Sequence, residues 1–194
     1  YFDVFAHLKG GQHFGQHTEL SLSHDAIEAQ IYDYALLQDQ SMAAAFYADK
    51  PDEYAHVPEN FVKLADMVLA HSPECKLILE HTWGYKKEEC KGFKTIEKFN
   101  DMLREGCATI AALKNAEISH IGDAFIAVDT KKLGNSLHAS DDHHQSYYGS
   151  YLKACVNYLM ITGEPFSENV ANCGIDPQKA EILRKAAEKT VLGE

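Results

Sequence analysis

The sequence of 194 residues lacks the marks of several protein classes. No apolar run approaches the roughly 20 residues that a membrane-crossing helix needs, and residues 1–4 lack the basic-then-apolar order of a secretory leader. The five cysteines include no C-x-x-C pair, and their odd number argues against a complete disulfide framework or a zinc knuckle. Internal repeats and low-complexity linkers are also absent. We therefore expect a single domain over residues 1–194 and no insertion into a membrane.

Basic residues are scarce as well. The chain has 18 lysines and arginines against 29 aspartates and glutamates, which gives a formal net charge of −11 at pH 7. The basic residues are scattered along the sequence and form no cluster that could bind a phosphate backbone. Nucleic acid is therefore not an expected partner. Hydrophobic residues make up 45% of the chain, which is typical of a domain that folds around its own core.

Short apolar segments, which we interpret as strands, alternate with amphipathic segments, which we interpret as helices. This alternation is typical of βαβ units. We expect strands at residues 2–8, 34–38, 76–83 and 117–122, and helices at 26–32, 58–70, 96–114, 151–161 and 177–191. Cys107 and Cys155 fall on apolar helix stripes, where a thiol behaves as a small hydrophobe. The pattern predicts a three-layer α/β/α sandwich with a parallel, flavodoxin-like sheet, in which ligands bind beyond the carboxyl ends of the strands.

Two candidate site segments follow expected strands. Gly10 and Gly11 end the first strand, and glycines allow backbone amides to approach a ligand closely. Gln38 ends the second strand, and a side-chain amide can donate to a developing oxyanion. Each segment also has an ordinary interpretation, as a tight turn or as loop residues.

A third candidate lies in the polar, histidine-rich stretch of residues 129–150. Asp141 and His144 are three residues apart, just before an expected helix. This spacing lets the carboxylate accept a hydrogen bond from the imidazole Nδ1, so that Nε2 faces outward as a base. Such a pair is the orienter-and-base half of a hydrolytic triad. The alternative is a solvated loop whose aspartate caps the helix.

Taken together, these segments resemble the SGNH-hydrolase (GDSL-type esterase) superfamily, in particular its bacterial branch with a Gly-Gly-x-x-apolar-x-x-His second block. The matching segments occur in the family's order and cover most of the chain: residues 10–17, 36–39, 82–83, 121–125, 141–144, 149–152 and 158–163. The superfamily is one of hydrolases that act on ester bonds and need no cofactor.

The resemblance implies a role for each site residue. Asp141 and His144 are the expected orienter and base, and the Gly11 amide with the Gln38 side chain is the expected oxyanion hole. On the substrate side we expect three further residues: His13, His17 and Trp83. An O-acetylated carbohydrate or another small ester is the implied substrate, rather than a long-chain lipid. A secreted or periplasmic location follows by analogy alone.

One block of the superfamily has no counterpart. Its first block is a strand ending in Gly-Asp-Ser or Gly-Asn-Ser that carries the nucleophile. We expect this block before the first strand, that is, upstream of Tyr1, where the given sequence begins. That strand lies in the middle of a flavodoxin-like sheet, so its loss would leave backbone groups unpaired. We therefore expect that one βα unit of roughly 30 or more residues has been cut away, is disordered or is assigned elsewhere. Residues 133–136 spell Leu-Gly-Asn-Ser, but they follow no convincing strand, and Ser136 is not expected to be the nucleophile.

A metal hydrolase is a second hypothesis. The chain has 11 histidines, and His13 and His17 have the i, i+4 spacing of helical metal ligands. The set would be completed by Asp141, His143 and His144. Against this hypothesis, the three glycines at positions 10, 11 and 15 make a helix there improbable, and our leading prediction includes no metal.

A non-catalytic glycan-binding protein of the same fold is a third hypothesis, because the expected nucleophile is missing. Such a protein would keep the cleft and bind sugar rings by stacking. The aromatic residues available near strand ends and in the polar loop are Trp83, Tyr85, Tyr147 and Tyr148.

Overall fold

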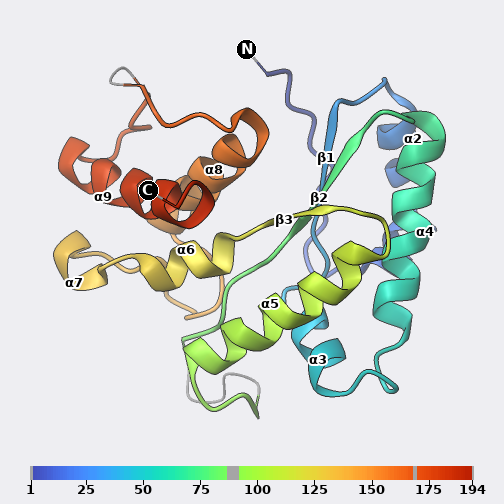
Figure 1. Ribbon diagram of the computed structural model, residues 1–194, viewed down its shortest axis with the longest axis horizontal. Coiled ribbons are helices and arrows are strands. Elements are labelled where there is room, and N and C mark those ends of the chain that lie inside the picture. Colours follow the sequence, from blue (N-terminus) through green and yellow to red (C-terminus); the bar gives the residue numbers. More distant parts are fainter. Residues whose placement is uncertain (1, 87–91, 168–169, 194) are drawn as a thin grey trace. The chain divides into compact units, whose positions relative to one another are not determined.

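The computed structural model describes residues 2–86, 92–167 and 170–193 (Figure 1). Three strands form a sheet in the order β1-β2-β3, namely β1 (Tyr34–Leu37), β2 (Lys76–Glu80) and β3 (Glu117–Ser119). The chain divides into two compact units. The first unit is Tyr1–Glu80 with Glu105–Ile118, and the second unit is His81–Arg104 with Ser119–Glu194.

The first unit is built around the parallel pair of β1 and β2, in which Tyr34 lies opposite Lys76 and Leu37 opposite Leu79. Its helices are α1 (Phe14–His17), α2 (Ser21–Glu28), α3 (Ala43–Asp49), α4 (His56–His71) and the second half of α5 (Ile96–Ala112). The α4 helix buries one face at helical spacing, and this face forms the centre of an apolar core with β2 and α5. The buried residues of that core include Val57, Phe61, Leu64, Val68, Leu77, Leu79, Cys107 and Ile110.

The second unit contains the segment that follows β2 and four helices of the C-terminal part. These are α6 (Ile121–Ala127), α7 (Thr130–Leu133), α8 (Tyr147–Thr162) and α9 (Pro177–Val191). Asp176 caps α9 by accepting hydrogen bonds from the first backbone amides of the helix, as its position before Pro177 predicts. The core of this unit joins α6, α8 and α9, and it includes Ile121, Phe125, Leu152, Cys155, Leu159 and Leu183. Within the described ranges, no helix has the combined length and apolarity to cross a bilayer.

The main features expected from the sequence are confirmed. The fold is mixed α/β with a parallel sheet, and three of the four expected strands are present, at residues 34–37, 76–80 and 117–119. The four long helices lie within a few residues of their expected positions. Cys107 and Cys155 are buried thiols, while Cys90 lies outside the described residues.

The strand expected at residues 2–8 is wrong. This segment has no regular structure, and Val4 and Leu8 are 83% and 88% exposed. Alternation of apolar and polar residues favours a strand only when a neighbouring strand supplies hydrogen bonds. In the part of the chain that the structure describes, β1 is an edge strand of the sheet, and residues 2–8 are not paired with it.

Two helix expectations and one strand expectation also need correction. The helix expected at residues 26–32 lies at 21–28, and the segment expected to continue β3 to residue 122 turns into α6 at Ile121. The helix α1 forms although the glycines at positions 10, 11 and 15 were expected to make a helix there improbable. Its first amides are satisfied by side chains, because Gln16 Oε1 accepts from the His13 amide and Asp39 Oδ1 accepts from the Phe14 amide.

Gly106 generates a prediction about the first unit. It lies in α5, and a Cβ placed on it would come within 2.0 Å of the Ala44 carbonyl oxygen in α3. A Gly→Ala change in an exposed helix usually stabilises by up to about 1 kcal/mol. Here we expect Gly106→Ala to lower the free energy of unfolding by about 1–3 kcal/mol, because the helices must separate.

Urea unfolding followed by circular dichroism measures this change. The matched control is Ala108→Ser, on the exposed face of the same helix, and it should change the free energy by less than about 0.5 kcal/mol. A Gly106→Ala variant as stable as the wild type would contradict the close contact between α3 and α5.

Candidate active site

A short hairpin before α8 carries the acid and the histidine predicted as catalytic. Residues 137–146 fold back on themselves through an antiparallel bridge between His138 and Gln145, and two backbone hydrogen bonds of 2.8 Å close the turn. Asp142 lies at the tip with a φ of 62°, in the left-handed region that aspartate tolerates better than most residues. Ser146 ends the hairpin and caps α8 with its side chain. The hairpin therefore presents residues 141–144 at its tip.

Asp141 holds His144 in one orientation. Its Oδ2 lies 2.6 Å from His144 Nδ1, and its Oδ1 accepts hydrogen bonds from the backbone amides of His143 and His144 at 3.1 and 3.0 Å. An ionised carboxylate only accepts, so Nδ1 of His144 carries a proton, and in the neutral form of the ring the lone pair is on Nε2. The side chain of His144 is 71% exposed, which leaves this lone pair open to a ligand.

The same contacts keep Asp141 ionised. The hydrogen bond from the His144 side chain, followed by those from the two amides, holds the pKa of Asp141 well below its usual range. The carboxylate is therefore charged throughout the neutral range. An ionised acid that holds the neighbouring imidazole by Nδ1 is the arrangement that general-base chemistry needs.

The segment after β2 anchors the hairpin. Trp83 Nε1 donates to the His143 carbonyl at 2.8 Å, the Lys86 amide donates to the Asp142 carbonyl at 2.9 Å, and His138 Nε2 donates to the Gly84 carbonyl at 2.9 Å. Trp83 is only 5% exposed, and its ring stacks on the ring of Phe125. Trp83 thus positions the backbone of the site and does not offer a ring face to a ligand.

Ser136 lies in a Gly-Asn-Ser sequence like that of a nucleophile block, but its side chain forms hydrogen bonds at the start of the hairpin. Its hydroxyl oxygen accepts from Lys86 Nζ at 3.1 Å and from the His138 amide at 3.0 Å.

Of the other aromatic residues considered for sugar stacking, Tyr85 lies against the His143 ring, Tyr147 is largely exposed, and Tyr148 faces the Lys179 ammonium.

In the first unit, the structure brings together the two segments predicted to form the oxyanion hole. Asp39 joins them, because its Oδ1 accepts from the Phe14 amide at 3.0 Å and lies 3.3 Å from His13 Nδ1. Gly11, with a φ of 72°, precedes this contact in the chain, and Gln38 is the residue before Asp39. Both are exposed, and their role in an oxyanion hole stays a prediction.

The two histidines of this segment have different surroundings. The hydrogen bond with Asp39 raises the pKa of His13, and burial only partly offsets that effect. Burial lowers the pKa of His17, whose Nδ1 lies 3.0 Å from Ser23 Oγ and whose ring packs against the ring of His7. His13 therefore favours its charged form more than His17 does, and the substrate contacts predicted for both remain predictions.

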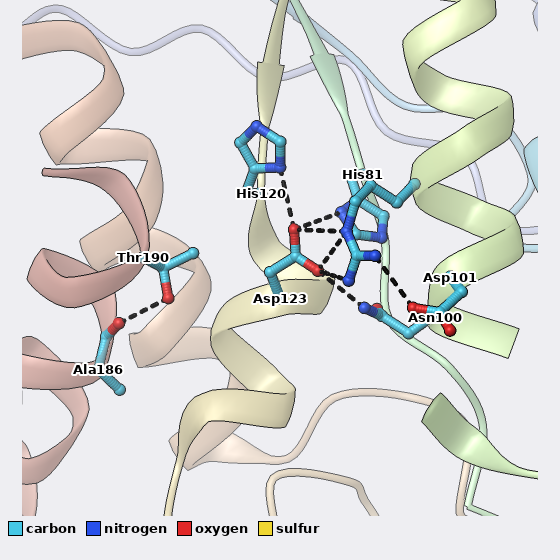
Figure 2. Close-up of polar contacts among 8 residues, drawn as sticks. His81, Asn100, Asp101, His120, Asp123, Ala186 and Thr190 are labelled. Carbon is cyan, nitrogen blue, oxygen red and sulfur yellow. Dashed lines mark hydrogen bonds and ion pairs between the residues drawn. The ribbon is translucent and has the colours of Figure 1, made fainter. Parts of the chain in front are cut away.

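A second polar cluster was not predicted from the sequence. His81 follows β2, His120 follows β3, and the Asp123 carboxylate in α6 lies between them and Asn100 (Figure 2). Arg104 in α5 also binds this carboxylate, with its Nε 2.9 Å from Asp123 Oδ1. A histidine directly after each of two neighbouring parallel strands was a usable signal, because the carboxyl ends of such strands lie side by side.

Two groups among the described residues have metal-ligand chemistry. They are Asp141 with His143 and His144, and Asp123 with His81 and His120. In the first group Nδ1 of His143 and Nδ1 of His144 both have hydrogen-bond partners within the turn, whereas neither ring nitrogen of His81 in the second group has one. The geometry of the first group therefore favours an acid–histidine pair over a metal site.

Comparisons with known proteins identify the fold. No family model matches the sequence, and no curated protein sequence matches it. The structure is similar to that of a DUF4886 family protein from Bacteroides uniformis, with a TM-score of 0.71 and 20% sequence identity over 87% of this chain and 66% of the other. This chain thus spans about two thirds of that protein.

A candidate SGNH hydrolase from Slackia heliotrinireducens is also similar, with a TM-score of 0.63 and 21% identity over 78% of this chain and 80% of the other. The two likenesses show that the chain has an SGNH-hydrolase-like α/β fold, as the sequence resemblance implies. At these identities they show the fold alone, because one fold hosts many activities.

His138 generates a prediction about stability. Burial lowers its pKa below the ordinary value of 6.5, and the hydrogen bond to the Gly84 carbonyl offsets only part of this effect. Below pH 6.5 the unfolded chain takes up a proton that the folded protein resists. The free energy of unfolding should therefore fall as the pH decreases from 6.5, by at most about 1.4 kcal/mol per pH unit for this group.

Chemical denaturation at a series of pH values between 5 and 8 measures the effect, with the range chosen around the histidine pKa of about 6.5. The His138→Gln variant keeps an amide donor for the Gly84 carbonyl but cannot titrate, so part of the pH dependence should disappear. The exposed His24→Gln variant is the control and should keep the wild-type profile. Identical profiles for the wild type and His138→Gln would contradict the assignment.

Proposed function

We propose that this protein is a serine-dependent ester hydrolase that acts on small esters, such as acetyl groups on carbohydrate. The observation that carries the proposal is the 2.6 Å contact between Asp141 Oδ2 and His144 Nδ1, with Nε2 of His144 exposed. A carboxylate that fixes a neutral imidazole in this way defines a general base. The SGNH-hydrolase-like fold supports the same class of reaction.

In the proposed reaction His144 handles the proton. A serine hydroxyl attacks the ester carbonyl carbon while Nε2 of His144 accepts the hydroxyl proton. The resulting tetrahedral intermediate collapses when the bond to the alcohol breaks, and the imidazolium returns its proton to the departing oxygen. Water then attacks the acyl-serine by the same proton route, which releases the acid and restores the serine hydroxyl.

Asp141 and the oxyanion donors stabilise the charges that form. The ionised Asp141 stabilises the transient imidazolium of His144 and does not itself take the proton. The Gly11 amide and the Gln38 side-chain amide are proposed to donate to the oxyanion, an interaction worth on the order of 3 kcal/mol per donor. The contact through Asp39 supports this pairing of donors, because it joins their two segments within the first unit.

The acyl group and the alcohol are proposed from the sequence resemblance. Bacterial members of the resembled branch often remove acetyl groups from glycans, and an acetyl ester needs little room beyond the oxyanion donors. His13 and His17 are proposed to contact the alcohol part of the substrate, since His13 caps α1 and His17 is its last residue, on the same segment as Gly11.

The acid–base pair gives the first kinetic prediction. With the complete protein and p-nitrophenyl acetate or acetylated xylan, His144→Ala and Asp141→Asn should each lower kcat by about 10³–10⁴-fold or more, because the general base is lost or mis-oriented. Circular dichroism checks that both variants fold. The matched control is His143→Gln, which changes the neighbouring imidazole and should retain activity within about threefold of wild type, as expected for a residue outside the reaction.

Other outcomes identify the competing hypotheses. If His143→Gln lost as much activity as His144→Ala, the Asp141, His143 and His144 group would be acting as a metal site. If the wild-type protein bound acetylated glycans without turning them over, it would be a glycan-binding protein. Unchanged turnover in His144→Ala would remove this histidine from the reaction.

Gln38 gives the second kinetic prediction. Gln38→Ala should reduce kcat by about 10²–10³-fold with little change in KM, because an oxyanion donor acts mainly in the transition state. The exposed Gln178 at the start of α9 provides a control, and Gln178→Ala should have wild-type kinetics. A fall in kcat/KM that came entirely from KM would assign Gln38 to substrate binding instead.

A further inference from the structure

The second unit contains a fully buried histidine whose ring nitrogens make no hydrogen bond. His81 has 0% of its surface exposed, and neither Nδ1 nor Nε2 has a hydrogen-bond partner. Leaving a buried polar group unsatisfied destabilises a folded protein, so such groups are rare unless they have a function. Burial also keeps this imidazole neutral at pH 7, because it lowers the pKa of His81 to about 4.

Two other metal-ligand side chains lie beside His81. Oδ2 of Asp123 is 3.8 Å from His81 Nδ1 and accepts a hydrogen bond from His120 Nδ1 at 3.1 Å (Figure 2). A cation bound through His120 Nδ1 would replace the proton of this hydrogen bond. One ligand atom from each of the three residues can be chosen so that all lie within 4.8 Å of one another. The three side chains come from the ends of β2 and β3 and from the first turn of α6.

These distances suit a small cation. With metal–ligand bonds of about 2.0–2.1 Å, neighbouring donors in a tetrahedral or octahedral site lie roughly 2.9–3.4 Å apart. One of the two measured donor distances falls in this range, and the other needs a contraction of a few tenths of an ångström. Two imidazoles and one carboxylate are a donor set that zinc, cobalt and ferrous iron accept.

The other oxygen of Asp123 is held by neighbouring groups. Asn100 Nδ2 and Arg104 Nε each donate to Oδ1 at 2.9 Å, so the carboxylate is fixed in place. Arg104 Nε is also 3.1 Å from Oδ2, and its positive charge opposes a dication. Asp101, 3.0 Å from the Arg104 Nη1, compensates part of that charge. A hydrogen-bonded ligating carboxylate is a general feature of protein metal sites.

We propose that His81, His120 and Asp123 bind one divalent transition-metal ion, with zinc as the reference ion. The half-buried His120 leaves the remaining coordination positions open to water. The ion ties the residues that follow β2 and β3 to α6, all within the second unit, and it satisfies a nitrogen of His81. This site is separate from the Asp141–His144 pair and does not depend on the proposed hydrolysis.

Titration of the metal-free protein with zinc chloride and cobalt chloride tests the proposal. The starting variant is His143→Gln with His144→Gln, which removes the other metal-ligand group. It should bind one equivalent of zinc in calorimetry, and bound cobalt should give the visible absorption of a nitrogen-coordinated site. Adding His120→Gln to this variant should weaken zinc binding at least tenfold, because a ligand is lost, and should abolish the cobalt spectrum.

Thermal unfolding supplies an independent readout. Zinc at about 100 times its Kd should raise the melting temperature of the starting variant by about 5–10 °C, through preferential binding to the folded state. His81→Leu should lose this rise and yet be at least as stable as the starting variant without metal, because the unsatisfied nitrogens are gone. If His81→Leu fails to fold, His120→Gln on the exposed side of the cluster carries the same test.

The overturning results are equally specific. If the starting variant binds no zinc at concentrations up to about 100 µM, a range well above the Kd of a structural zinc site, the cluster is an ion-pair network only. Zinc binding that His120→Gln and His81→Leu leave unchanged would place the ion elsewhere in the protein. Neither result bears on esterase activity, which the Asp141→Asn and His144→Ala variants test by themselves.

Discussion

The hydrogen bonds that fix the chain as it leaves β2 determine the geometry of the second unit. His81 pairs with β3 through its amide, and its carbonyl accepts from the Gly122 amide at the start of α6. Gly122 packs so closely that a Cβ there would lie 2.2 Å from the Thr82 carbonyl oxygen. A few residues further on, Trp83 and Lys86 hold the hairpin of the candidate site. The segment of residues 81–86 therefore positions both the cluster around Asp123 and the hairpin that carries Asp141 and His144.

The features predictable from the sequence are those encoded locally. The apolar strands at 34–37 and 76–80 and the capped helix at 177–191 are readable because their burial pattern and capping residues lie within each segment. The Asp141–His144 contact was also predictable, since a spacing of three residues in a tight turn brings the two side chains together. The family resemblance added the fold, which the structural comparisons support.

The features that could not be predicted depend on partners distant in the sequence. Alternation in residues 2–8 indicated a strand, but a strand forms only against a neighbour. The helix α1 depends on Asp39, which is 25 residues from Phe14. The contact of Trp83 with the His143 carbonyl spans 60 residues, so the sequence could indicate an aromatic residue near the site but not its buried, positioning role.

The compactness of the acid–histidine pair has a mechanical consequence. Asp141 and His144 belong to one turn, and the same carboxylate that orients the ring also binds the two amides of that turn. Any displacement of the hairpin tip consequently carries both groups as one rigid piece, and the tautomer of the ring survives the movement. The turn itself thus sets which ring nitrogen faces outward, before any ligand is bound.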